Sequence, residues 1–201
     1  METVLLHSCC APCSAAVLEW MLDHDIRPVV FYFNPNIFPQ AEYEKRKTEL
    51  TAHCARLGVE VIDADWDHAA WLAGVKGLEN EPERGRRCAA CFSMRLRAAA
   101  KVAHDRGIKR FTTTLASSRW KSLEQVNAAG KAAAAEYDGL EYWDKNWRKD
   151  GLQDRRNVLL KEYGFYNQTW CGCEFSLRDA KKRQEQKHAQ DKAAVGAATG
   201  N

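Results

Sequence analysis

The stretch from residue 4 to residue 14 reads Val-Leu-Leu-His-Ser-Cys-Cys-Ala-Pro-Cys-Ser, and it decides the fold that the sequence predicts. Its apolar start, residues 4–6, predicts a short buried strand, which the cysteines and Pro12 bring to an end. Apolar residues then recur at helical spacing from Val17 to Leu22, with Ser14 expected as the N-cap of this helix. A loop between a buried strand and a helix lies at the edge of a parallel sheet where ligands bind.

Strands and helices continue to alternate along the first part of the chain. We expect strands at residues 29–33 and 59–62, and between them a helix at residues 42–57 that ends at Gly58. This alternation predicts an α/β fold with a doubly wound, mainly parallel sheet and right-handed crossovers. Later segments favour helices at 66–73, 91–106, 122–137 and 152–163, and a strand at 110–115. Neither G-x-G-x-x-G nor G-x-x-x-x-G-K-[ST] follows the first strand, which disfavours a dinucleotide or P-loop site.

The length of 201 residues and the apolar content of 45 % fit one domain with a core of its own. We expect a catalytic α/β domain with a helical C-terminal part over residues 1–178, and a charged, disordered tail over residues 179–201. The N-terminus does not read as a secretory signal, and no apolar run approaches the roughly 18 residues of a membrane span. A cytoplasmic location and reduced thiols follow as predictions.

Seven of the eight cysteines stand in three short groups: Cys9-Cys10-Ala-Pro-Cys13, Cys88-Ala-Ala-Cys91 and Cys171-Gly-Cys173. The thiolate is a soft ligand for iron, zinc and copper, and two nearby cysteines can hold one metal centre. We expect the fold to gather the three groups, which together exceed the four ligands of one tetrahedral zinc. Cys54 stands apart on the apolar face of the helix at 42–57, and we interpret it as a small buried hydrophobe.

Three polar features near the cysteines each allow two interpretations. His7 directly precedes the first group and is either a proton donor or a satisfied core histidine. Residues 112–119 end a strand with hydroxyls and an arginine, which slightly favours an anion-binding turn over a helix cap. The basic run at residues 84–87 abuts Cys88, and it is either a solvated helix face or a positive rim for a polyanion such as RNA.

The aromatic residues also divide between core and function. Tyr142, Trp143 and Trp147 either stack on unpaired RNA bases or pack within a small lobe. Tyr43 lies on the apolar face of its predicted helix, although its hydroxyl has the length to reach a substrate.

These motifs together resemble the cobalamin-independent epoxyqueuosine reductases, the QueH family. The resemblance spans residues 5–178 with all three cysteine groups in the family's order, so we consider it specific. The matching stretches are Leu5-Leu6-His7-Ser8-Cys9-Cys10-Ala11-Pro12-Cys13-Ser14, Phe33-Asn34-Pro35-Asn36-Ile37, Tyr43 with Arg46, Arg87-Cys88-Ala89-Ala90-Cys91-Phe92, Thr113-Thr114-Leu115-Ala116-Ser117-Ser118, and Tyr166-Asn167-Gln168-Thr169-Trp170-Cys171-Gly172-Cys173-Glu174-Phe175-Ser176.

The resemblance implies the last step of queuosine synthesis in tRNA. Epoxyqueuosine at the wobble position of the anticodon loses its epoxide oxygen in a two-electron reduction and becomes queuosine. The family resembles the adenine nucleotide α-hydrolases in fold, and it uses a [4Fe-4S] cluster with an adjacent mononuclear iron. Since no nicotinamide or flavin motif is present, we expect an external electron donor, a ferredoxin or flavodoxin.

Residue roles are carried over on the matching motifs. The resemblance implies that four cysteines hold the cluster: Cys9, Cys10, Cys88 and Cys91. It assigns Cys13, Cys171 and Cys173 to the second iron, or Cys171 and Cys173 to a redox-active disulfide. Some relatives carry Asp at the position of Cys13, which indicates a ligand position that accepts oxygen or sulfur. The candidate proton sources are His7, Tyr32 and Tyr43.

Two other classes of function compete with this reading. A zinc module that binds RNA explains the Cys-x-x-Cys pair and the basic runs, but it leaves Cys171 and Cys173 unused. A metal-free thiol–disulfide oxidoreductase would need an exposed cysteine pair with a lowered pKa. Iron and sulfide analysis discriminates both from an iron–sulfur enzyme.

Overall fold

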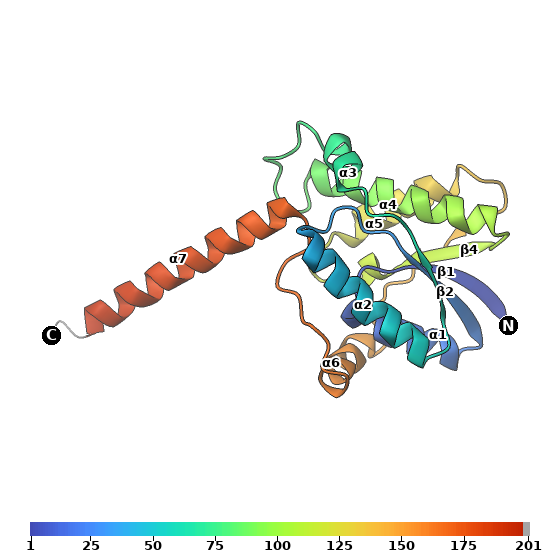
Figure 1. Ribbon diagram of the computed structural model, residues 1–201, viewed down its shortest axis with the longest axis horizontal. Coiled ribbons are helices and arrows are strands. Elements are labelled where there is room, and N and C mark those ends of the chain that lie inside the picture. Colours follow the sequence, from blue (N-terminus) through green and yellow to red (C-terminus); the bar gives the residue numbers. More distant parts are fainter. Residues whose placement is uncertain (199–201) are drawn as a thin grey trace.

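The computed structural model describes residues 1–198 and contains a five-stranded sheet with helices on both faces (Figure 1). Every neighbouring pair of strands is parallel, and the strand order is β3-β2-β1-β4-β5. The predicted α/β fold with a doubly wound parallel sheet is confirmed. The strands are β1 (Glu2–His7), β2 (Ile26–Tyr32), β3 (Glu60–Asp63), β4 (Arg110–Thr113) and β5 (Glu141–Tyr142).

Strand β1 lies at the centre of the sheet. Leu5 stands opposite Val29 of β2 on one side and Phe111 of β4 on the other, and all three side chains are buried. The chain runs outward from β1 to β3 and then returns to add β4 and β5 on the opposite side. The loops after β1 and β4 therefore flank the point where the strand order reverses, which is the usual ligand site of such a sheet.

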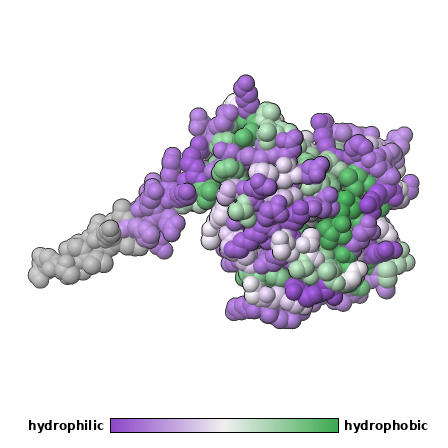
Figure 2. All heavy atoms as spheres, viewed as in Figure 1, coloured by the Kyte–Doolittle hydropathy of each residue, from purple (hydrophilic) through white to green (hydrophobic). Residues whose placement is uncertain are grey.

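The helices cover both faces of the sheet. In Figure 1, α1, α2 and α6 lie on one side of the strands, and α3, α4 and α5 lie on the other. Helix α7 projects from the body, and its described surface is hydrophilic (Figure 2). No described helix combines the length and the apolar character that crossing a membrane requires. The helices are α1 (Ala11–Asp23), α2 (Gln40–Arg56), α3 (His68–Gly74), α4 (Arg86–Asp105), α5 (Leu123–Ala134), α6 (Leu152–Glu162) and α7 (Glu174–Ala198).

Several element boundaries differ from the expected ones. Helix α1 begins earlier, with Cys10 at its N-cap, so the assignment of Ser14 as the N-cap was wrong. The Ser14 hydroxyl instead donates a 2.8 Å hydrogen bond to the Cys10 carbonyl one turn back. Strand β4 stops at Thr113 and continues as the 3₁₀ helix Thr114–Ser117. The two-residue strand β5 was not expected, because so short a strand has no recognisable period.

Helices α4 and α7 are both longer than expected. Helix α4 begins at Arg86, so Cys88 and Cys91 lie one turn apart in its first turns. Helix α7 continues through residue 178 to Ala198, because the Ala, Lys, Gln and Glu residues of this segment are strong helix formers. The structure describes α7 as helical through Ala198. Residues 199–201 lie outside the described range, and the division into domain and tail stays a prediction.

We expect Gly130→Ala to destabilise the edge of the sheet. A Cβ atom at Gly130 of α5 would lie 2.4 Å from the Tyr142 ring of β5, so the buried ring would have to move. This overpacking should cost about 1–3 kcal/mol and outweigh the helix propensity that alanine adds. Thermal unfolding followed by circular dichroism measures the loss, with Ala128→Ser on the exposed side of α5 as control. An unchanged melting temperature for Gly130→Ala would contradict close packing of α5 on β5.

Candidate functional site

A pocket of about 620 Å³ opens at the carboxyl edge of β1 and β4. Its wall combines the loop after β1, the loop after β4 and helix α6, together with Arg46 of α2 and Arg148 of the loop after β5. The segment that precedes Cys171 closes the remaining side. The lining residues are Cys9, Cys10, Cys13, Arg46, Ser117, Ser118, Arg119, Trp120, Lys121, Arg148, Gln153, Arg156, Asn157, Leu160, Asn167, Gln168, Thr169, Trp170 and Cys171.

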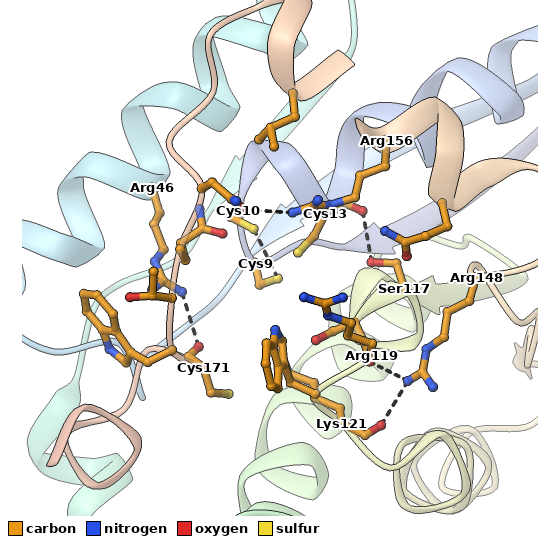
Figure 3. A pocket seen from close by; sticks show the side chains of 18 of the residues that line it. Cys9, Cys10, Cys13, Arg46, Ser117, Arg119, Lys121, Arg148, Arg156 and Cys171 are labelled. Atoms are coloured by element: carbon orange, nitrogen blue, oxygen red, sulfur yellow. Dashed lines mark hydrogen bonds between the residues drawn. The ribbon is translucent and has the colours of Figure 1, made fainter. Parts of the chain in front are cut away.

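Three thiols of the first cysteine group meet in this pocket. The sulfur atoms of Cys9, Cys10 and Cys13 all lie within 4.8 Å of one another, and those of Cys9 and Cys10 are 3.8 Å apart. They come together because Cys9 ends the loop after β1, Cys10 caps α1, and Cys13 lies in the first helical turn. Figure 3 shows the three sulfur atoms between Arg46 on one side and Arg148 on the other.

The 3₁₀ helix after β4 braces this loop. The Thr114 hydroxyl accepts a hydrogen bond from the Cys9 backbone N–H at 3.3 Å and donates to the Cys9 sulfur at 3.7 Å. The Ser117 hydroxyl donates to the Cys13 carbonyl at 3.2 Å. Contacts between the segments that follow β1 and β4, which are far apart in sequence, thus hold the three thiols together.

The pKa values of the three thiols are shifted in different directions. Hydrogen bonds from Cys10 and Cys13, together with the positive charges of Lys121 and Arg95, hold the pKa of Cys9 well below its usual range. The pKa of Cys10 is raised instead, first by its hydrogen bond with Cys13 and second by its hydrogen bond with Cys9. The positive side chains of Lys121 and Arg95 thus favour a thiolate in this group of cysteines.

A second group of thiols adjoins the first. Cys88, Cys171 and Cys173 line a cavity of about 30 Å³, and Cys91 packs with Cys173 in a small apolar cluster around Trp71. Burial raises the pKa of Cys88 to about 11 and that of Cys173 to about 12, and the charge of Cys171 adds to both shifts.

The two thiol groups are continuous through shared residues. Trp120, Lys121 and Cys171 line both the large pocket and the small cavity. The fold thus brings all seven clustered cysteines to one region, whereas Cys54 lies in the main core, where burial raises its pKa to about 12. All eight cysteines are free thiols.

The sulfur atoms can be compared with the ligand sets that the resemblance implied. Among the described residues, Cys9, Cys10 and Cys13 are the cysteines close enough to bind one metal ion together. Cys88 and Cys91 lie with Cys171 and Cys173 instead. A soft, thiol-only donor set fits a metal centre, and the assignment of each cysteine to a particular iron stays a prediction.

The structure places the expected proton sources away from the pocket wall. His7 is fully buried, and its ring nitrogens bond to the Thr113 hydroxyl at 2.8 Å and the Phe33 carbonyl at 3.1 Å. Burial and then Arg95 lower its pKa to about 3. The Tyr43 hydroxyl donates to the Ala64 carbonyl at 3.1 Å. The Tyr32 hydroxyl donates to the Tyr43 carbonyl at 3.2 Å. None of the three residues lines the pocket, and their role as proton donors stays a prediction.

The aromatic residues after β4 pack in the core. Trp147 is 1 % exposed and donates to the Thr112 hydroxyl at 3.1 Å, and Tyr142 is buried against Phe111. Trp143 packs against Trp147. The packing interpretation is confirmed for Tyr142 and Trp147, whose burial leaves no ring face for an RNA base, and Trp143 is partly buried against the same core.

The turn after β4 contains the helix cap considered for residues 112–119, and the anion-binding interpretation stays a prediction. The Thr113 hydroxyl accepts from the Leu115 N–H at 3.1 Å, which is a helix cap. Arg119 at the end of the turn faces the pocket.

Two cations near the thiols were not predicted as site residues from the sequence: Lys121 and Arg46. Lys121 is 8 % exposed; burial opposes its charge, but the thiols of Cys171, Cys9 and Cys13 outweigh burial and raise its pKa. Arg46 bonds Glu42 at 2.7 Å and donates to the Cys171 carbonyl at 3.3 Å. Arg46 had a sequence signal in the motif match, whereas Lys121 carried none.

The rest of the pocket wall is basic. Arg119, Arg148 and Arg156 line it, and no Asp or Glu does. None of these three arginines forms a salt bridge within the part of the chain that the structure describes. Uncompensated positive charge around a cavity attracts anionic ligands.

Comparisons with known proteins agree on one family. The family model described as epoxyqueuosine reductase QueH matches residues 4–179. The chain is 47 % identical to epoxyqueuosine reductase QueH of Haemophilus influenzae over 183 residues, which cover 91 % of this chain and 75 % of the relative. It is 44 % identical to the protein of the same name from Acinetobacter baylyi, with 97 % and 89 % covered. The corresponding protein of Thermotoga maritima is 34 % identical, with 94 % and 96 % covered.

We expect Gly172→Ala to disturb the placement of Cys171 and Cys173. Gly172 has a φ of +123°, which side chains rarely adopt, and an added Cβ would lie 3.0 Å from Arg46 and 3.1 Å from Ile37. The variant should lose metal and melt at a lower temperature, as elemental analysis and thermal unfolding would detect. Gly164→Ala is the matched control, because Gly164 has a φ of +63° with open space around it. Equal metal content in both variants would show that the turn tolerates a side chain.

We also expect Glu19→Gln to weaken the docking of α6, which forms one wall of the pocket. Arg155 of α6 donates two hydrogen bonds to Glu19 of α1, at 2.5 and 2.6 Å, and they lower the pKa of Glu19. A lowered carboxyl pKa stabilises the fold above the ordinary value of 4.5, and this contribution is lost as the pH falls through the folded-state pKa.

The pair is half exposed, so its loss at neutral pH should cost about 0.2–1 kcal/mol. Melting curves of wild type and Glu19→Gln should differ at neutral pH and converge in acid. A constant difference at every pH would contradict this contribution.

Proposed function

The chain belongs to the epoxyqueuosine reductase QueH family, and we propose that it performs the family reaction with an iron–sulfur centre held by its clustered cysteines. It is an oxidoreductase, and the reaction of its family is the last step of queuosine biosynthesis. The observation that supports the proposal is a thiol-lined pocket in which Lys121 and three arginines have no carboxylate partner within the described chain: Arg119, Arg148 and Arg156.

The donor set supports an iron–sulfur centre. We propose that Cys9, Cys10, Cys88 and Cys91 hold a [4Fe-4S] cluster, with Cys13, Cys171 and Cys173 on a second, mononuclear iron. A redox-active disulfide between Cys171 and Cys173 is the alternative use of that pair. When bound, the iron–sulfur group supplies the electrons that the reduction needs.

The cations of the pocket would bind the RNA substrate. Arg119, Arg148 and Arg156 are suited to the phosphates around the wobble nucleotide of a tRNA, because guanidinium groups bind phosphate in two-point contacts. The volume of about 620 Å³ lies in the range of sites for small molecules, so the pocket is of a size for one nucleotide and not for a duplex. The modified nucleotide would therefore leave the anticodon loop to reach the thiols.

The deep end of the pocket would receive the epoxide. Lys121 carries its positive charge between the two thiol groups and so stabilises thiolates on both sides. Removal of the epoxide oxygen as water consumes two electrons and two protons and leaves the carbon–carbon double bond of queuosine. We propose that a ferredoxin or flavodoxin supplies the electrons and that the reaction takes place in the cytoplasm.

Purification without oxygen tests the cofactor. We expect about five irons and four sulfides per chain, with a broad absorption band at about 400 nm. Incubation with a reductant and tRNA carrying epoxyqueuosine should yield queuosine, as detected by mass spectrometry of the nucleosides. A colourless protein with one zinc and no conversion would favour the RNA-binding zinc module.

We expect Cys91→Ala to remove most of the cluster absorption and the reductase activity, because it deletes one proposed ligand. Cys54→Ala is the matched control: it also deletes a buried thiol, but one in the main core. That control should keep its iron and activity. Full iron content and activity in Cys91→Ala would contradict the ligand assignment.

A further inference from the structure

One tryptophan of the chain is unlike the others in its surroundings. Trp120 is 55 % exposed, whereas the remaining six tryptophans are buried or partly buried. It lines the large pocket together with Arg119, whose guanidinium lies 5.0 Å from the centre of the indole ring. An exposed indole adds little to the stability of the fold, so its position calls for another explanation.

The backbone that carries Trp120 is held firmly. Four consecutive carbonyls, of residues 118–121, each accept a hydrogen bond from an arginine. Arg84 donates to the carbonyls of Arg119 and Trp120 at 3.0 and 3.1 Å. Arg148 donates to those of Ser118 and Lys121 at 2.5 and 3.0 Å. The loop is thus fixed while its largest side chain faces solvent, as in a preformed binding platform.

Size and charge indicate what this platform binds. If the pocket takes one nucleotide, the neighbouring bases of the RNA loop remain outside it, where the solvent-exposed part of the Trp120 indole is accessible to them. Unpaired bases stack on aromatic side chains, and the surrounding arginines suit the phosphates that connect them. We propose that Trp120 stacks on an unpaired base adjacent to the nucleotide in the pocket and thereby positions the RNA. This inference rests on the proposed function.

The first experiment measures binding of a fluorescent anticodon stem–loop RNA with guanosine at the wobble position to the anaerobically purified protein. Trp120→Ala should weaken binding about 5- to 150-fold, which corresponds to one lost base–aromatic stack. Trp120→Phe should keep most of the affinity. Tyr163→Ala removes another exposed aromatic ring, one that lies outside the pocket wall, and should bind like wild type.

Two further readouts separate stacking from other causes. Trp120→Ala should leave the salt dependence of binding unchanged, whereas Arg156→Ala should reduce its slope by about one phosphate contact. RNAs with one base of the loop removed at a time should identify the partner. On the RNA that lacks the stacked base, wild type and Trp120→Ala should bind equally well.

The outcomes distinguish the two proposals. Wild-type affinity in Trp120→Ala, or an equal loss on every base-deleted RNA, would overturn the stacking inference and leave the reductase intact. Failure of the wild-type protein to bind the stem–loop and to convert the modified tRNA would overturn the proposed function itself. Equal metal content and melting temperature in the two Trp120 variants establish that binding, and not folding, has changed.

Discussion

The parallel pairing of β4 with β1 is the contact on which the site depends. Its register sets Leu6 opposite Thr112 and His7 opposite Thr113, and so brings Thr114 to the backbone and sulfur of Cys9. A slip by one residue would turn each side chain to the other face of the sheet. Thr113 would then leave His7, and the cysteine loop would lose its brace. The buried pairs of the central strands, such as Leu5 beside Phe111, therefore specify the geometry of thiols that they never touch.

A second constraint is the balance of buried charge. Lys121, Arg46 and Arg95 are all nearly inaccessible to water, and buried cations are costly unless anions compensate them. Arg46 has Glu42, and Arg95 bonds the side-chain oxygen of Asn34. Lys121 has the thiols, whose negative charge raises its pKa despite burial. The cations and the thiolates stabilise each other, so a change that removes one of them also destabilises the other.

The sequence predicted the parts of this molecule that follow local rules. Alternating apolar strands and helices determined the sheet, and close spacing marked seven cysteines as a set. The sequence did not predict the features that depend on contacts between distant segments of the chain. The split of the thiols into two adjoining groups results from where α4 and the turn at Gly172 meet. Trp120 and Lys121 belong to no repeating pattern, and only the folded loop shows that one side chain is exposed and the other buried. The burial of Trp147 could not be predicted for the same reason, since it depends on a contact with Thr112, which is distant in sequence.

In the proposed function, the arginines of the pocket would recognise the RNA and the thiol-lined end would carry out the chemistry. Arginines that bind phosphate carry no information about the base, so they raise affinity for modified and unmodified RNA alike. Binding that is equal for substrate and for non-substrate, or for ground state and transition state, does not accelerate the reaction. On this proposal, selection of the epoxide would come from groups that contact the modified ring itself, at the thiol-lined end beside Lys121. The same few side chains would then determine both which nucleotide reacts and how fast, whereas the arginines would determine how long the RNA stays bound.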